Sequence, residues 1–169
     1  MLLIRSATKP DWDSIWPIFQ GVLRAGDTYA LPSDLSPAEA KTFWLRPDQY
    51  VYVAVQEGRI VGTYWLRPNQ SGPGGHVANA AFLVAPFARG QGVGRALGEH
   101  GLAEAQRLGF RAMQFNFVVS TNTAAIHLWQ QLGFTVVGTL PHAFRHPQRG
   151  FVDACVMFRS LTDAHGNLD

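Results

Sequence analysis

A glycine-rich turn between a predicted strand and a predicted helix is the feature that most limits how this chain can fold. Residues 81–84 (AFLV) form an apolar, strand-like run, and the segment 89–94 that follows reads RGQGVG. Glycines permit backbone torsions closed to other residues and let the chain come close to a ligand. The N–H groups at the start of the next helix, with the positive end of its dipole, form a site for anions. Arg89 and Arg95 flank the turn and can donate to phosphate oxygens. The pattern therefore predicts a diphosphate-binding loop.

Two common nucleotide-binding loops do not fit this segment. A Walker loop ends in Gly-Lys-Ser/Thr, whereas Gly94 is followed here by Arg95 and Ala96. A Rossmann turn has its third glycine three positions after the second and an acid about 20 residues further on. Position 95 is arginine, however, and residues 112–119 contain no acid. A glycine turn without any ligand stays open as the structural alternative.

The remaining pattern predicts a mixed sheet with helices on its faces. Capping residues and apolar spacing predict helices over 11–26, 36–44, 93–108 and 122–133. In the first of these Asp11 is the expected cap and Gly26 the expected stop. Apolar and alternating runs predict strands that begin at residue 2 and that cover 50–55, 60–66, 77–84, 113–119, 134–140 and 151–158. The predicted elements follow the order β-α-α-β-β-β-α-β-α-β-β. This order is typical of an α/β (α+β) domain. Long loops are expected over 67–76 and 141–150, where they would form a lid over a pocket.

Composition narrows the class of protein. The chain has 169 residues, 47% of them hydrophobic and 15% charged, which predicts one folded domain over 1–161 and a polar tail over 162–169. Its net charge of +2 comes without a run of Lys or Arg, so neither nucleic acid nor a membrane is an expected partner. No run approaches the roughly 18 apolar residues of a membrane helix. Cys155 is the only cysteine, which excludes an intrachain disulfide and favours a reducing, cytoplasmic location.

Two motifs in order resemble one enzyme family. The segment 84–94 (VAPFARGQGVG) resembles the acyl-CoA-binding motif of the GCN5-related N-acetyltransferases, the GNAT family. The helix and strand that follow in that family are similar to Asn122, Ala125, 128–129 (LW) and 132–134 (LGF). The resemblance covers about residues 50 to 160. Within the family, a yeast subgroup that acetylates azetidine-2-carboxylate and related cyclic imino acids is similar in segments 62–64, 79–84, 115–116, 121–122, 137–143 and 152–154.

The resemblance implies a GNAT fold, with a mixed central sheet of six to seven strands and about four helices. Its splayed central strands would hold acetyl-CoA as cosubstrate. The backbone of the strand before the glycine turn would pair with the pantetheine arm, the turn would take the pyrophosphate, and a strand-end N–H would stabilise the developing oxyanion. The amine would attack the thioester directly, without a covalent enzyme intermediate. The expected cofactor-binding residues are Leu83, Val84, Arg89, Gly90, Gln91, Gly92, Val93, Gly94, Arg95, Asn122 and Trp129.

The catalytic groups are less clearly marked in the sequence. Strand 77–84 has no Asp or Glu to serve as a base, and Trp129 stands where many family members place a tyrosine acid. Asn79 and Asn116 interrupt apolar strands, and a buried amide needs partners. They would bind a substrate carboxylate or position the amine or its water, with a satisfied internal hydrogen bond or an outward orientation as the alternative. His76, beside the loop 67–76, is the candidate base, with a surface role as its alternative.

Other polar residues receive weaker roles. His142, His146 and Arg145 are expected at a pocket rim, and Tyr64 and Arg67 are further pocket candidates, with plain solvation as the alternative for the arginines. Cys155 is interpreted as core packing, and His100 and His127 as surface or packing residues. No histidine pair has metal-ligand spacing, so no metal is expected.

The expected function is therefore an acetyl-CoA-dependent N-acetyltransferase acting on a small-molecule amine, with a homodimer as the expected assembly. An imino acid or amino acid is the expected acceptor. Acetylation of a peptide or protein amine, and a non-catalytic acyl-CoA-binding sensor, stay open as alternatives.

Overall fold

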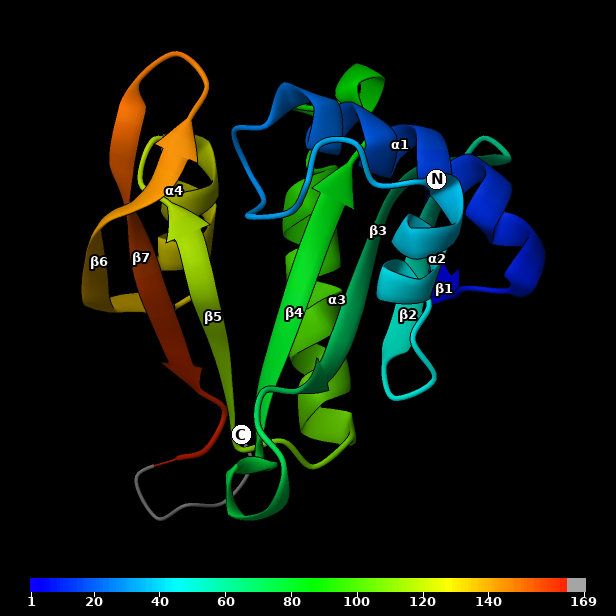
Figure 1. Ribbon diagram of the computed structural model, residues 1–169. Helices are drawn as coiled ribbons and strands as arrows, with labels where there is room; N and C mark the ends of the chain where they lie inside the picture. The colour runs from blue at the N-terminus through cyan, green and yellow to red at the C-terminus, as the bar shows by residue number, and fades with distance from the viewer. Residues whose placement is uncertain (164–169) are drawn as a thin grey trace.

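The computed structural model describes residues 1–163 as a seven-stranded sheet with helices on both faces (Figure 1). The strands lie in the spatial order β1-β2-β3-β4-β5-β7-β6, and only the pair β4–β5 is parallel. The expected mixed sheet and the expected order of elements along the chain are confirmed. The expected tail lies outside the described residues from position 164 on. The strands are β1 Leu2–Ser6, β2 Tyr50–Gln56, β3 Arg59–Pro68, β4 Val77–Val84, β5 Ala112–Val119, β6 Thr135–His146 and β7 Gly150–Ser160.

Four α-helices cover the sheet, with α1 and α2 on one face and α3 on the other (Figure 1). Their ends follow local capping chemistry. At the start of α2, the Ser36 hydroxyl accepts from the Glu39 N–H at 3.3 Å, and the Glu39 carboxylate accepts from the Ser36 N–H at 2.9 Å. Gly26 ends α1 at φ 65°. None of the helices described is long and apolar enough to cross a membrane. The helices are α1 Trp12–Ala25, α2 Pro37–Trp44, α3 Val93–Arg107 and α4 Thr123–Gln131.

Asp11 is the exception among the expected caps. It stands at the N-cap position of α1, but its side chain makes no cap hydrogen bond there. The carboxylate instead pairs with the Arg5 guanidinium at 2.7 Å and accepts from the Thr8 N–H at 2.6 Å. The hydrogen bonds from Arg5 lower the pKa of Asp11 below its usual range. The prediction of Asp11 as the cap was wrong because a stronger, charged donor takes its oxygens.

Aromatic clusters hold the helices against both faces of the sheet. On one face the rings of Phe19 in α1 and Trp44 in α2 lie 4.9 Å apart, and Trp44 lies 6.4 Å from Trp65 of β3. On the other face, Tyr64 of β3 stacks on Phe82 of β4 at 5.0 Å. Each buried ring removes about 150–250 Å² from water. This packing makes β3 and β4 a rigid base for whatever lies beside them.

The two central parallel strands separate soon after they meet. β4 and β5 pair only at Val77↔Ala112 and Ala78↔Met113. Beyond these pairs the strands diverge, and Figure 1 shows the arrowheads of β4 and β5 far apart at the end near the start of α3. The expected splay of the central strands is therefore present. From Asn79 onward, the edge of β4 that faces β5 has no strand partner.

The loop expected over 141–150 does not exist as such. β6 continues through Pro141 to His146 and pairs with β7 as far as His146↔Gly150, so only residues 147–149 turn the chain. Proline is tolerated because β6 is the edge strand of the sheet. The pairing is irregular between Leu140 and Phe144, where His142 has a φ of 53°. Because this irregularity interrupts the alternation of side chains, the sequence pattern alone does not reveal that the strand continues. Loop 67–76 is also shorter than expected, since β3 runs to Pro68.

Candidate active site

The free edge of β4 is the first component of the site. The N–H of Ala85 donates to the carbonyl of Val61 at 2.8 Å, and Leu83 lies opposite Thr63 on the same neighbouring strand. Because alternate residues of a strand bond to opposite sides, the backbone groups of Leu83 face β3. Those of Phe82 and Val84 face the gap toward β5. The edge available to a ligand is therefore Phe82 and Val84 rather than the expected Leu83 and Val84.

The glycine turn lies at the open end of this gap, where α3 begins. Gly90 and Gly92 have φ angles of 75° and 81°, which glycine adopts without strain. Val93 is buried, so it offers its backbone alone. The first N–H groups of α3 have no partner within the helix. The turn therefore has the geometry expected of an anion site.

Side chains around this turn divide into two groups. Arg89 lines the adjoining cleft together with Gly94. Gln91 donates to the carbonyl of Phe87 at 2.9 Å. Arg95 turns toward Glu99, at 3.5 Å, and Gln131 of α4. Among the described residues, Arg89 is thus the arginine of this turn that the cleft reaches, whereas Arg95 lies outside both pockets.

Two adjoining pockets fill the gap between β4 and β5. The larger, about 710 Å³, lies beside the glycine turn and is lined by Val84, Arg89 and Arg149 among others. We call it the cofactor cleft. The smaller, about 270 Å³, lies farther along the gap and is called the acceptor pocket. Residues shared by the two linings show that they meet; these are Thr28, Phe82, Asn122, Ala125 and Trp129.

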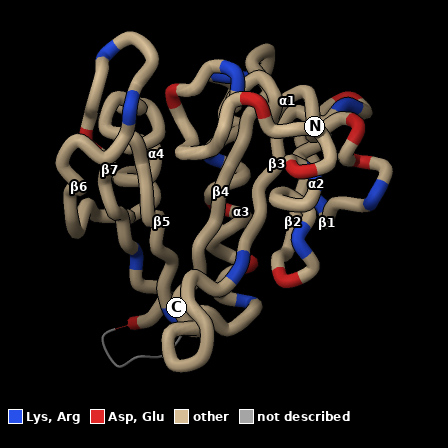
Figure 2. The backbone as a smooth tube through the Cα atoms, viewed as in Figure 1, with Lys and Arg blue, Asp and Glu red and all other residues tan. Residues whose placement is uncertain are grey.

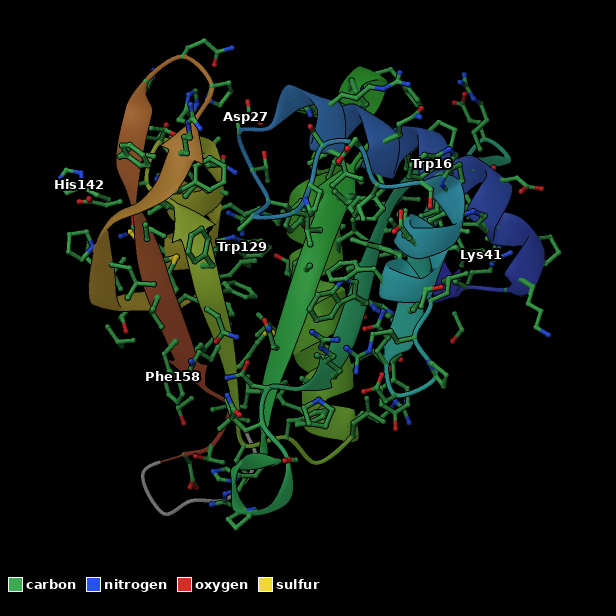
Figure 3. All side chains as sticks on the ribbon, viewed as in Figure 1. Trp16, Asp27, Lys41, Trp129, His142 and Phe158 are labelled. Atoms are coloured by element: carbon green, nitrogen blue, oxygen red, sulfur yellow. The ribbon has the colours of Figure 1, made fainter. Side chains whose placement is uncertain are left out.

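Trp129 forms the wall where the two pockets meet (Figure 3). Its ring centroid lies 4.9 Å from Phe82 and 4.8 Å from Phe115, and the side chain is buried. Indole has no acidic proton to give at neutral pH. Its place in the structure fits the expected wall and offers no acid. Asn122 caps α4 with its side-chain oxygen, which accepts from the Ala125 N–H at 3.3 Å, and it borders both pockets.

Asn79 and Asn116 both line the acceptor pocket, from β4 and β5 respectively. The Asn79 oxygen accepts from the neighbouring Ala80 N–H at 2.8 Å. Asn116 donates to the oxygen of Asn69 at 2.7 Å and accepts from Gln114 at 2.9 Å. The structure thus brings together the two amides that the sequence singled out. Each keeps an internal hydrogen bond while lining the pocket.

Comparison with known proteins assigns the family. A model of the acetyltransferase (GNAT) family matches residues 12–134, well over half of the chain. The chain belongs to the GNAT family of acetyltransferases.

Three known proteins illustrate the likeness. N-acetyltransferase aca1 of Schizosaccharomyces pombe is 32% identical over 162 residues, which cover 84% of this chain and 78% of that protein. A solved GCN5-related N-acetyltransferase from Kribbella flavida is 48% identical with a TM-score of 0.92, over 95% of this chain and 98% of that one. The structure of yncA from Salmonella typhimurium with its cofactor acetyl-CoA is 24% identical, with a TM-score of 0.82 over 96% and 95% of the two chains. The last likeness concerns the fold alone. The expected family and fold are confirmed.

Most of the remaining candidates lie away from the two pockets of this acetyltransferase. His76 is exposed, outside both pockets, with Nδ1 3.1 Å from the carbonyl of Pro73. His142 lies on the side of β6 turned away from β4 (Figure 3). Cys155 is buried in β7 opposite Val118, as packing requires. His146 is the one expected rim residue that reaches the cofactor cleft.

The side chain of Tyr64 lies on the face of the sheet that α3 covers. Its hydroxyl lies 2.7 Å from His100 Nδ1 on α3, and its side chain is fully buried. Tyr52 stacks on it at 4.9 Å and donates to Glu104. Burial lowers the pKa of His100, and the charge of Glu104 opposes that shift. This cluster supports α3 and does not reach the acceptor pocket.

Sequence reasoning missed several pocket residues of the acetyltransferase. Tyr29, from the segment between α1 and α2, donates to the Phe82 carbonyl at 2.9 Å on the free edge of β4. Burial raises the pKa of its hydroxyl, so it stays protonated at neutral pH. Trp65 lines the acceptor pocket, and Arg149 lines the cofactor cleft. Tyr29 and Arg149 lie in irregular segments with no periodic signal, and Trp65 is hidden in an apolar strand.

Charge is distributed unevenly around the gap. β4 and β5 carry no charged residue along their length, and positive residues lie on the β6–β7 hairpin above the gap (Figure 2). Arg149 of this hairpin and Arg89 of the glycine turn border the cofactor cleft. Two cations at the cleft suit the phosphates of an anionic ligand. Among residues 1–163, no three His, Cys, Asp or Glu side chains gather as metal ligands.

Proposed function

We propose that this acetyltransferase moves the acetyl group of acetyl-CoA directly to the amine of a small molecule, with a cyclic imino acid or an amino acid as acceptor. The observation that carries the proposal is the unpaired edge of β4, which runs from the glycine turn at Gly92 into a small pocket. An extended amide chain pairs with such an edge as a further strand does. A diphosphate fits the N–H groups, Arg89 and Arg149 at the open end.

The residues that would hold the cofactor follow from this geometry. Val84 would bond the pantetheine arm, the Phe82 N–H would face the thioester, and the glycine turn would bind the pyrophosphate. Trp129 and Asn122 would border the thioester at the meeting point of the two pockets. Binding of the pyrophosphate is assigned to the glycine turn and its flanking residues, namely Arg89, Gly90, Gln91, Gly92, Val93, Gly94 and Arg95. Arg95 is included because it lies in the first turn of α3.

The reaction needs positioning more than covalent help from the protein. The amine nitrogen attacks the thioester carbonyl, a C–N bond forms, and the C–S bond breaks as the CoA thiolate leaves. The Phe82 N–H faces the gap and is placed to stabilise charge on the carbonyl oxygen. The acceptor pocket is lined by no Asp, Glu or His. The proton of the amine therefore passes to water, with Asn79 and Asn116 orienting the amine or that water.

The imino-acid acceptor rests on the resemblance to the yeast subgroup and on the place of Asn79 and Asn116. Those two amides match the subgroup's strands, and both line the acceptor pocket. A volume of about 270 Å³ suits a small ring better than a peptide chain. Acetylation of a peptide or protein amine is the alternative acceptor, and an acyl-CoA sensor without turnover is the alternative class.

Location and assembly belong to the same proposal. A cytoplasmic location accords with the single free thiol of Cys155. A homodimer accords with the apolar surface of the edge strand β6 and its partner, where Val137 and Phe151 are 59% and 66% exposed. Sedimentation of the purified protein would test the assembly.

The proposed function is tested by acetyl-CoA-dependent thiol release with L-azetidine-2-carboxylate beside primary amino acids, polyamines and a peptide amine. Saturable release with the imino acid, and an N-acetylated product by mass spectrometry, is the expected result. Turnover with the peptide amine alone would show that the acceptor is a peptide or protein amine and not an imino acid. Binding of CoA without turnover of any amine would favour the sensor.

A further inference from the structure

A positively charged side chain lies in the acceptor pocket, in a largely apolar setting. Arg67 of β3 lines the pocket, and its guanidinium stacks over the Trp65 ring at 4.6 Å. The Arg67 Nη1 atom is buried and has no hydrogen-bond partner, and neither has the Trp65 indole N–H. The two residues are two positions apart in β3, so both side chains point to one face of the sheet. Two donors with unmet hydrogen-bonding capacity thus flank the pocket.

No carboxylate among the described residues pairs directly with Arg67. Its fellow lining residues include no acid, and it belongs to none of the ion pairs found in residues 1–163. Asp48 is the one carboxylate that affects it, and Asp48 is held by Arg46 at 2.6 and 2.8 Å. Burial lowers the pKa of Arg67, because the charged form loses solvation. The unpartnered Nη1 donor of this guanidinium is suited to a charge-assisted hydrogen bond with an anionic group.

A neutral neighbour is the alternative partner for this donor. Gln49 has a buried side-chain oxygen without a partner, and it directly precedes Tyr50, which pairs with Leu66 beside Arg67. The oxygen of this amide is a candidate uncharged acceptor for the guanidinium. An amide carries no charge, however, so the positive charge of Arg67 would still lack a counter-ion. The two explanations differ in whether Arg67 increases the affinity of the pocket for an anionic ligand.

We propose that Arg67 anchors an acidic group of the acceptor, so that the acetyl acceptor is an amine with a carboxylate a few bonds away. This inference rests on the proposed function and names the substrate class of that site. Asn79 lies directly opposite Arg67 across the β3–β4 pair and lines the same pocket. Arg67 holds the carboxylate at the inner end, and the amine extends toward Phe82 and Trp129 at the thioester end.

This arrangement separates the roles of the polar residues. A guanidinium gives a carboxylate charge-assisted hydrogen bonds that an amide cannot match. Asn79 and Asn116 are then free to hold the amine. An acceptor without the carboxylate leaves the cation uncompensated, so it binds more weakly. The pocket thereby selects amino or imino acids against plain amines of the same ring.

The test compares acceptors with and without a carboxylate on three variants. The ligand pairs are L-azetidine-2-carboxylate with azetidine, and L-proline with L-prolinamide. Arg67→Met keeps the methylene contact with Trp65 but removes the charge, and Arg67→Lys restores a charge. Arg59→Met is the matched control, because Arg59 also lies in β3 and stacks on a ring, Phe87, at 4.7 Å, outside both pockets. Calorimetric binding to the CoA-loaded protein and steady-state KM and kcat are both measured.

The expected result is a loss specific to the carboxylate. Arg67→Met should weaken binding of the two carboxylate ligands, and raise their KM, roughly 10- to 100-fold, with little change for azetidine and prolinamide. Arg67→Lys should recover part of the loss, and Arg59→Met should resemble the wild type. Equal losses for both members of a pair, or no loss for either, would overturn the inference. If Arg67→Met fails to fold, Arg67→Gln takes its place.

The inference and the proposed function can fail separately. Wild-type turnover of azetidine and prolinamide as efficient as that of the acids would sink the role of Arg67 and leave the acetyltransferase proposal standing. Absence of turnover with every amine would remove the proposed function, and the calorimetric pairs would still decide about Arg67. Wild-type protein that binds neither acid would also count against the anchor.

Discussion

Substituting the second glycine of the turn separates backbone strain from ligand binding. Gly92 has a φ of 81° at the start of α3, and Gly109 has a φ of 84° just past its end. A Cβ at either position meets nothing within 4 Å. The helix of 15 residues between them places the two glycines about 25 Å apart. Gly92→Ala and Gly109→Ala therefore impose the same strain at opposite ends of one helix.

The structure predicts that the two variants lose the same amount of stability but differ in their affinity for CoA. A non-glycine residue in this backbone region costs about 1–2 kcal/mol, which for a domain of this size lowers Tm by about 2–8 °C. Only Gly92→Ala disturbs the N–H groups assigned to the pyrophosphate. It should weaken CoA binding roughly 10- to 100-fold, as the loss of a hydrogen bond to a charged group predicts. Calorimetry with CoA and thermal melts measure both effects. Equal CoA affinity in the two variants would refute the assignment of the turn.

Three further predictions test packing, pH dependence and the direct transfer of acetyl. Gly62→Ala places a Cβ 2.9 Å from the Leu83 carbonyl and should lower the free energy of unfolding by about 1–3 kcal/mol. Gly21→Ala, exposed in α1 with open space around it, should raise it by up to about 1 kcal/mol in the same denaturation series. The folded state resists protonation of His100, so the unfolded state binds more protons and stability should fall as pH drops below about 6.5. His100→Gln should flatten this part of the Tm–pH curve, and an unchanged curve would contradict the assignment. Cys155→Ala should keep kcat near the wild-type value, because the thiol is buried packing; loss of turnover at an unchanged Tm would instead indicate a covalent intermediate.

Elements with local chemical signals could be predicted from the sequence. The capping box of Ser36, the stop at Gly26 and the cap at Asn122 each depend on residues within one helical turn. The glycine turn is likewise local, and its torsions match the expectation. The splay of β4 and β5 followed from the family resemblance and not from the pattern of residues.

Features that depend on partners distant in sequence were out of reach. β6 was cut short at Leu140 because the irregular pairing near His142 depends on Asp153, whose carboxylate accepts the His142 N–H at 2.9 Å. For Arg67 the sequence leaves a pocket role and plain solvation both open, since nothing in it reveals the stacking on Trp65. Tyr29 reaches Phe82 across 53 positions of the chain. Such contacts arise only when the strands are assembled.

In the proposed function, acetyl-CoA binds along the edge of β4 that has no strand partner. Amide hydrogen exchange on the protein with and without acetyl-CoA tests it most directly, residue by residue. The N–H groups of Phe82 and Val84 face the gap, so their exchange should slow markedly when acetyl-CoA is added. That of Leu83, already bonded to β3, should change little. Slowing that is equal at all three residues, or absent at Phe82 and Val84, would contradict the account.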